Sequence, residues 1–277
     1  MTPAIHNEAP PAPVTSPERA AALTLAVFVA ALLVSHAVFT WTWLATALPR
    51  PLSWLVQPVL AVALVWAGLR WLRPAGGPGV AEELGLARPL VAPLLFALMA
   101  SLPMAIGFGL GDDPLRSLDW LSLAFTLAVW PVVEEILFRG FAFRQLHRRA
   151  GWGFFSAALV PAALFAVIHV TVFFFRDQDL QLPLLAAGAS LLGALFFSWL
   201  FVAWGDNLWA PAAFHGVMNF WWEGFGVDRT GVGTWGGNLL RLSAVVLAVL
   251  LTVGWKSMFA RPSPGAGRAT EAASRAS

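Results

Sequence analysis

Residues 118–140 read LDWLSLAFTLAVWPVVEEILFRG, an apolar run long enough to cross a membrane that is interrupted by two adjacent glutamates, Glu134 and Glu135. A charged side chain at bilayer depth is costly, so it usually has a partner and a function. On a helix, Glu135 and Arg139 are four residues apart and face each other in the favourable order for an ion pair. Glu134 is turned by about 100° from that pair. We therefore expect Glu135 and Arg139 to be structural and Glu134 to be the reactive carboxylate.

The composition is that of a polytopic membrane protein. The 277 residues are 58% hydrophobic and only 12% charged, and a soluble domain carries about twice that charged fraction. The absence of cysteine excludes disulfides, cysteine-ligated zinc and a thiol nucleophile. The isoelectric point near 10.3 reflects arginine-rich tails and loops, so we expect no nucleic-acid partner.

Hydropathy predicts an all-α bundle of about eight transmembrane helices. A span needs about 20 apolar residues, and the seventh run is short for a full crossing. The predicted runs are 20–47, 53–73, 89–110, 118–140, 153–175, 183–204, 208–222 and 237–259. They form a membrane-embedded domain over 19–260, flanked by disordered tails at 1–18 and 261–277.

The distribution of charge predicts the orientation of the bundle. Basic residues gather after the second, fourth and eighth runs, at 70–88, 139–149 and 256–275, whereas the loops at 112–119 and 176–179 are acidic. By the positive-inside rule the ends of the even-numbered runs are cytoplasmic. The sequence thus predicts an integral protein of the bacterial inner membrane with both termini in the cytoplasm. Residues 80–88 fit either a short interfacial helix or a solvated connector.

Three further polar residues interrupt the later runs. His169 lies in the fifth run, and His215 and Asn219 share one face of the seventh. Each desolvated polar group needs a partner, so we expect one cluster in the bundle interior. A carboxylate and an imidazole can hold a water and take its proton, while a second imidazole and a carboxamide can donate hydrogen bonds to an oxyanion. This set predicts amide hydrolysis without a covalent nucleophile.

The depths of the two predicted partners in this cluster differ. We expect Glu134 one or two turns from the cytoplasmic end of its span, whereas His169 comes sixteen residues after Gly153. The two can share a water only if the fifth span kinks at Pro161 or extends below the membrane surface. We would then expect a cavity that opens to the cytoplasm.

Three motifs carry a resemblance to a known family. Glu134-Glu135-xxx-Arg139, Phe165-xxx-His169 and His215-xxx-Asn219, with the block 193–219 leading into the last, resemble the signature of the CPBP family of CAAX proteases and bacteriocin-processing proteins. This family includes the Ras-converting CAAX endopeptidase and the bacterial Abi proteins. The resemblance implies a glutamic-type intramembrane endopeptidase without cofactor or metal. It implies that Glu134 and His169 activate water, that His215 and Asn219 form the oxyanion hole, and that Glu135 and Arg139 are structural.

Other functions fit part of the pattern. A Glu/His/His set can hold zinc, although the sequence has no HExxH. A non-catalytic immunity or scaffold protein can use the same cluster for stability. A proton-coupled transporter is disfavoured because the polar residues crowd into 134–219 with almost no counterpart in 1–117. The expected partners are the lipid bilayer and a membrane-associated protein or peptide substrate, with a C-terminal sorting anchor or a bacteriocin precursor as the candidates.

Overall fold

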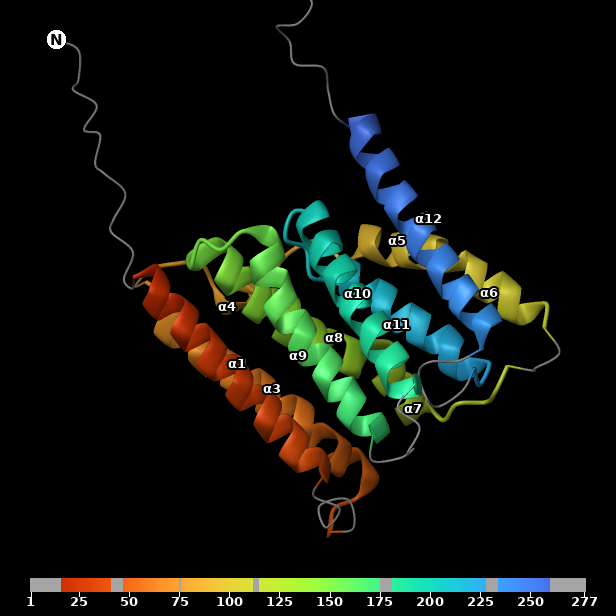
Figure 1. Ribbon diagram of the computed structural model, residues 1–277, viewed down its shortest axis with the longest axis horizontal. Coiled ribbons are helices and arrows are strands. Elements are labelled where there is room, and N and C mark those ends of the chain that lie inside the picture. Colours follow the sequence, from red (N-terminus) through yellow and green to blue (C-terminus); the bar gives the residue numbers. More distant parts are fainter. Residues whose placement is uncertain are drawn as a thin grey trace, which may run out of the picture.

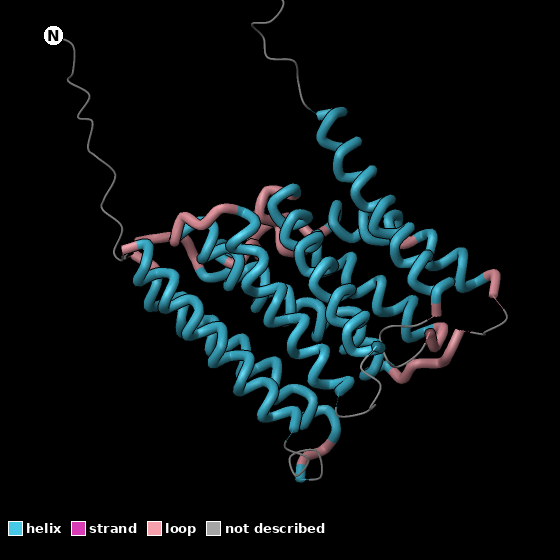
Figure 2. Tube along the Cα trace, viewed as in Figure 1, coloured by secondary structure: helices cyan, strands magenta, loops and turns pink. Residues whose placement is uncertain are grey.

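The computed structural model describes residues 16–40, 47–74, 76–111, 115–174, 181–227 and 234–259, without the side chains of 35–40, 169–174, 181–183 and 255–259. Every regular element within these ranges is helical (Figures 1 and 2). The fold is therefore all-α, as predicted. The tails predicted at 1–18 and 261–277 lie outside the described residues, apart from Ser16 to Glu18 at the start of the first helix.

The helices follow the predicted apolar runs closely. Each of the eight runs coincides with one helix or with one series of consecutive helices. In chain order the elements are α1 (Pro17–Thr40), α3 (Arg50–Leu72), α4 (Val80–Glu83), α5 (Val91–Ala100), α6 (Leu102–Gly109), α7 (Trp120–Ala124), η1 (Phe125–Val129), α8 (Trp130–Glu135), η2 (Ile136–Phe143), η3 (Gln145–Arg149), α9 (Phe154–Phe174), α10 (Gln181–Ala203), α11 (Trp209–Gly224) and α12 (Trp235–Phe259), where η marks a π-helical stretch.

Five helical segments among the described residues are long and apolar enough to span a bilayer. They are α1, α3, the series from α7 to η3, α10 and α12, and the pair α5–α6, bent by 42°, makes a sixth if it counts as one span. Helix α11 has 16 residues, so the seventh run is short, as predicted.

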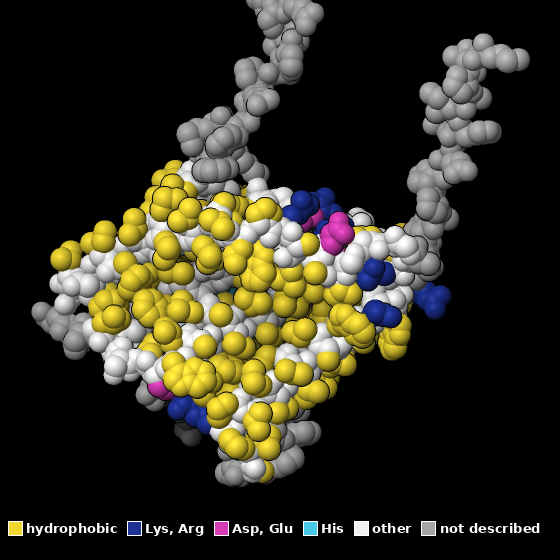
Figure 3. Space-filling view, turned by 180° about the vertical axis from the view of Figure 1, so that it is seen from behind, with side chains coloured by type: hydrophobic (Ala, Val, Ile, Leu, Met, Phe, Trp, Pro, Cys, Tyr) yellow, Lys and Arg dark blue, Asp and Glu magenta, His cyan; other side chains and the backbone are white. Residues whose placement is uncertain are grey.

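The outer surface is apolar in the way that lipid contact requires. Large aliphatic side chains on four different helices are more than half exposed, namely Leu33, Val59, Leu192 and Leu250. In Figure 3, apolar side chains cover most of the visible face, and the charged side chains gather towards its margins. Soluble monomers rarely expose contiguous apolar surface on this scale. The chain is therefore an integral membrane protein.

The segment that carries the glutamates is the most buried of these spans. Residues 120–149 form one helical segment in which α-helical and π-helical stretches alternate, and 44% of it is buried, against 22–33% for the other four candidate spans. The prediction that this span ends near residue 140 is wrong. The helical segment continues to Arg149, and Arg139 is only 1% exposed. Glu134 therefore lies fifteen residues before Arg149, near the middle of the segment.

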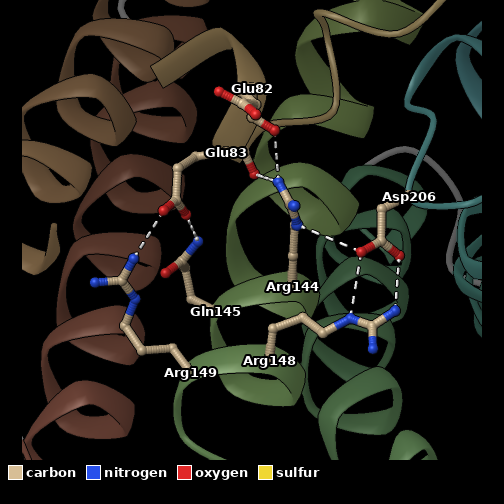
Figure 4. Close-up of polar contacts among 7 residues, drawn as sticks. All are labelled: Glu82, Glu83, Arg144, Gln145, Arg148, Arg149 and Asp206. Atoms are coloured by element: carbon tan, nitrogen blue, oxygen red, sulfur yellow. Dashed lines mark hydrogen bonds and ion pairs between the residues drawn. The ribbon is translucent and has the colours of Figure 1, made fainter. Parts of the chain in front are cut away.

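A polar network at the end of this segment explains why it continues past residue 140 (Figure 4). Its members are Glu82, Glu83, Arg144, Gln145, Arg148, Arg149 and Asp206. Glu83, buried on α4, pairs with Arg149 at 3.0 Å, and Asp206, in the turn between α10 and α11, pairs with Arg148 at 3.2 Å and with Arg144 at 3.6 Å. Residues 80–88 are thus a docked helical turn and not a solvated connector.

The other end of the segment is held by Asp119. Its side chain accepts hydrogen bonds from the backbone amides of Leu121 and Ser122, which caps α7. It also pairs with Arg50 at 2.8 Å. The hydrogen bonds from Arg50, followed by those from Ser122, hold the pKa of Asp119 well below its usual range.

Helix α9 packs against η2 in a register that brings position 169 to the level of Glu134. The rings of Phe138 and Phe165 are in contact, with centroids 4.8 Å apart. Glu134 lies one turn before Phe138, and His169 lies one turn after Phe165 on the neighbouring helix. Helix α9 is continuous through Pro161. The expected difference in depth assumed that the fourth span ends near residue 140, and the continuation of the segment to Arg149 removes that premise. The approach of His169 to Glu134 stays a prediction.

Candidate active site

A buried ion pair anchors the site to the neighbouring helices. Glu135 is fully buried, and its Oε1 accepts a hydrogen bond from Arg139 Nη1 at 3.0 Å, which is the pair expected from the spacing. Arg139 Nη2 also donates to the carbonyl oxygen of Ala194 on α10 at 3.2 Å. Its guanidinium lies 5.2–5.9 Å from the ring centroids of three aromatic side chains, Phe138, Phe165 and Phe197. These contacts fix the orientation of Glu135.

His215 lies between the two glutamates, which the sequence did not predict. Its Nδ1 is 3.0 Å from Oε1 of Glu135, and its Nε2 is 3.8 Å from Oε2 of Glu134. The imidazole stacks on Phe197 with ring centroids 5.3 Å apart. A hydrogen bond to an ionised carboxylate places a proton on Nδ1, so Nε2 is the nitrogen presented to Glu134. Glu135 therefore orients the imidazole of His215 as well as the guanidinium of Arg139.

The two adjacent glutamates lie in different environments. The side chain of Glu134 is 34% exposed, whereas that of Glu135 is 0% exposed. The 3.8 Å between Glu134 and His215 is longer than a hydrogen bond. Glu134 is thus the partly exposed carboxylate, and Glu135 is the one that the protein holds in place.

Gly216 allows α11 to bring His215 to this position. Helix α11 packs against η1 and α8, and a Cβ at residue 216 would overlap the carbonyl oxygen of Leu127. A residue without a side chain is needed for this close approach of two backbones. The neighbour of His215 in the sequence therefore sets the distance between the imidazole and the glutamates.

We expect Gly216→Ala to push α11 away from η1 and to separate His215 from Glu135. Overpacking of this kind costs about 1–3 kcal/mol, so both the melting temperature in detergent and the rate of the predicted amide hydrolysis should fall. Gly188→Ala on α10 is the matched control, because a Cβ there meets nothing within 4 Å. The control should keep both properties. A Gly216→Ala protein with wild-type rate and melting temperature would contradict the role given to this contact.

A cavity of about 780 Å³ lies beside the cluster, and His215 and Asn219, one turn apart on α11, both line it. The cavity extends to the exposed side chains of Arg116 and Glu223. Arg116 precedes the start of the central segment, so this end of the cavity lies away from the basic residues at Arg144 to Arg149. This cavity therefore extends towards the end of the bundle opposite the basic residues, and the expected opening to the cytoplasm stays a prediction.

Three charged residues of the cavity were not among the predicted site residues. Glu223 lines the cavity and accepts a hydrogen bond from Thr126 Oγ1 at 2.8 Å. Arg116 and Arg241 also line it. Arg241 lies inside the apolar run 237–259, and a charge in such a run is itself a signal of a functional site.

Two further predictions concern a metal ion and the role of His169. Within the described side chains, no group of three histidines, aspartates or glutamates is arranged to hold a metal ion. The side chain of His169 lies outside the description, so its part in the site stays a prediction. Phe165, one turn before His169 on α9, contacts Phe138, one turn after Glu134.

A comparison with known proteins agrees with this geometry. Residues 116–221, which contain all three motifs, match the family described as Type II CAAX prenyl endopeptidase Rce1-like. No curated protein and no solved structure gave a match to the chain. The family match supports a CAAX-type intramembrane protease activity. It confirms the resemblance that the three motifs predict and relates the chain, through the segment that carries its site, to the CAAX proteases of the CPBP family.

Proposed function

We propose that the protein is an intramembrane glutamic endopeptidase that hydrolyses a peptide bond in a membrane-associated protein or peptide. The observation that carries the proposal is the contrast between the accessible Glu134 and the buried, paired Glu135, with His215 between them. Two titratable groups in such different environments typically divide reactive and supporting roles. The adjoining cavity supplies room for a peptide.

In the proposed mechanism Glu134, assisted by His169, takes a proton from a water molecule. The water oxygen attacks the carbonyl carbon of the peptide, and the resulting oxyanion accepts hydrogen bonds from His215 and Asn219. The C–N bond then breaks, and the departing amine nitrogen takes the proton back from Glu134. The shared level of positions 134 and 169 supports the pairing of these two residues.

The neighbours of His215 support its role as a donor. To donate from Nε2 while Nδ1 donates to Glu135, the imidazole must carry both protons. In that form Glu134, Glu135, Arg139 and His215 together have no net charge, which is the favourable state for a cluster with little access to water. Glu135 and Arg139 thus support the site without touching the reacting atoms.

The 3.0 Å contact between Glu135 and His215 favours a second mechanism for the same activity. A neutral His215, oriented by Glu135, can itself take the proton of the water at Nε2, as in other carboxylate–histidine pairs. Glu134 would then only stabilise charge. Substitution of Glu134 separates the two mechanisms.

The test of the function is hydrolysis by the purified protein in detergent. We expect cleavage of a membrane peptide into two products, detected by mass spectrometry, with one ¹⁸O atom from labelled water in the new carboxylate. Activity should survive exhaustive chelation, with less than one zinc per chain by elemental analysis. Zinc at one per chain that tracks activity would favour the zinc-dependent variant. A folded wild-type protein that cleaves no candidate substrate would favour the immunity or scaffold function.

We also propose eight spans with both termini in the cytoplasm of a bacterium. The start of α1 and the end of α12 lie at the same end of the bundle as the basic η3 (Figure 1), and the positive-inside rule assigns such an end to the cytoplasm. In this orientation the cavity reaches the opposite side. A C-terminal sorting anchor or a bacteriocin precursor, the candidate substrates, would be cut near that side.

A further inference from the structure

The cavity lies between two neighbouring helices that run in opposite directions. Helices α10 and α11 lie side by side (Figure 1) and are joined by the short turn at 204–208. Phe197 of α10 stacks on His215 of α11, and this contact fixes their register. One turn from it, Gly193 and Asn219 both line the cavity. Gly193 therefore lies about 6 Å along α10 from Phe197, in the direction away from the basic end of the bundle.

Gly193 leaves the α10 side of the cavity open at this level. A Cβ at residue 193 would meet no described atom within 4 Å, and the residue is half-buried. Gly216 differs, because a Cβ there would overlap the carbonyl oxygen of Leu127. Glycine is less favourable than alanine inside a helix. At Gly216 it permits contact between two helices, whereas at Gly193 it provides space in the cavity.

Three large apolar side chains from three helices face the cavity near this space. They are Phe165 of α9, Phe197 of α10 and Met218 of α11. Met218 directly precedes Asn219, so it also lies about one turn from the stacked rings. Aromatic rings and a flexible methionine are favourable surroundings for another large apolar group. The volume of about 780 Å³ is typical of pockets that enclose a ligand.

The spacing along α10 determines which residue of a bound peptide lies beside Gly193. In the proposed mechanism the peptide bond to be cleaved lies beside His215. Gly193 is about 6 Å further along, and an extended chain covers about 3.3–3.6 Å per residue. The side chain beside Gly193 therefore belongs to a residue about one or two positions from the cleaved bond.

We propose that Gly193 is a specificity-determining residue, which makes room for a large apolar side chain about one or two residues from the cleaved bond. The substrate class is then a peptide with a side chain of the size of leucine or phenylalanine at this position. The proposal rests on the proposed function, because it takes the bond beside His215 as the one that is cleaved. Gly193 determines which peptide fits, while the groups near Glu134 perform the reaction.

Binding can be measured without turnover in the full-length Glu134→Gln protein in detergent. The probes are an uncharged, N-acetylated and amidated octapeptide of alanine and valine, and a series in which one phenylalanine replaces each residue in turn. We expect phenylalanine at the preferred position to tighten binding about 10- to 100-fold, the effect of burying one large apolar side chain. Equal affinity of the parent peptide and the whole series would overturn the proposal.

Gly193→Leu in the same Glu134→Gln background should remove this preference, because leucine fills the space that phenylalanine would occupy. We expect the affinities for the phenylalanine peptide and the parent to come within about threefold of each other. Gly188→Leu is the matched control on the same helix, because a Cβ there also meets no described atom within 4 Å, but residue 188 does not line the cavity. The control should keep the preference.

The ratio of the two affinities separates a specific role from general damage to the protein. A Gly193→Leu protein that keeps the ratio would refute the role of Gly193, and so would one that binds both peptides more weakly by the same factor. If Gly193→Leu does not fold, Gly193→Ala decides the question. One added methyl group should lower the ratio by about threefold or more, and an unchanged ratio would refute the proposal.

Cleavage by the protein with Glu134 intact provides a second readout. As phenylalanine is moved along the peptide, the cut should move with it and stay about one or two residues away, as mass spectrometry of the products will show. Gly193→Leu should lower the ratio of kcat/KM for the phenylalanine peptide to that for the parent by about 10-fold or more. Cuts that do not follow the phenylalanine would refute the role of Gly193 and leave the proteolytic function intact. Absence of cleavage with a retained binding preference would refute the function and leave the pocket at Gly193 intact.

Discussion

Glu134→Gln is expected to lower the rate of peptide cleavage by about 10²- to 10⁴-fold, the usual contribution of a general base. The melting temperature should stay at the wild-type value. The side chain of Glu134 is one-third exposed, and Nε2 of His215 lies 3.8 Å away, beyond a hydrogen bond. Glutamine therefore removes the base while Glu135 still contacts both Arg139 and His215. The measurement is cleavage by the purified variant in detergent together with thermal unfolding.

Glu82→Gln is the matched control, because Glu82 is an exposed glutamate of α4 at the basic end of the bundle. It should keep the full rate. If Glu134→Gln also keeps the full rate, Glu134 is not the base. The pair formed by Glu135 and His215 then becomes the candidate.

Glu135→Gln is expected to destabilise the protein by about 3–5 kcal/mol, the usual cost of removing one partner of a buried ion pair. Arg139 is only 1% exposed, and its positive charge would stay buried without the negative charge of Glu135 to balance it. Glutamine has the same shape as glutamate and keeps an oxygen that accepts hydrogen bonds. The loss of stability therefore measures the contribution of the negative charge. Thermal unfolding in detergent provides the measurement.

The double variant Glu135→Gln/Arg139→Met is the control for this prediction. It removes both charges and should be more stable than Glu135→Gln alone, since a buried pair can often be replaced by apolar groups at little cost. A single variant as stable as the wild type would mean that Arg139 is balanced by other groups.

The helices were predictable because their main determinant is local. Apolar runs of about 20 residues are visible in the sequence, and each one became a helix or a helix series. The end of the fourth run was wrong because the first arginine, Arg139, looked like a boundary. Its burial depends on Ala194 and on three aromatic rings. The extension to Arg149 depends on Glu83 and Asp206, and neither residue is close to Arg149 in sequence.

The composition of the site was more predictable than its geometry. The spacing of Glu135 and Arg139 gave their ion pair correctly, because one helix determines it. The contact between Glu135 and His215 arises where two backbones approach at Gly216, and no periodicity in the sequence reports such an approach. Arg241 was visible in principle as a charge within an apolar run, and it was overlooked.

The cluster at the middle of the central segment also bears on how the chain enters the membrane. An ionised side chain at the centre of a lone span opposes insertion by roughly 2.5–3.5 kcal/mol, and this segment carries Glu134, Glu135 and Arg139. The compensating contacts come from Ala194 on α10 and His215 on α11, which the ribosome makes at least 45 residues later. We therefore expect residues 120–149 to enter the bilayer stably only after α10 and α11 have been synthesised. The residues that perform the reaction would then also set the order in which the bundle is assembled.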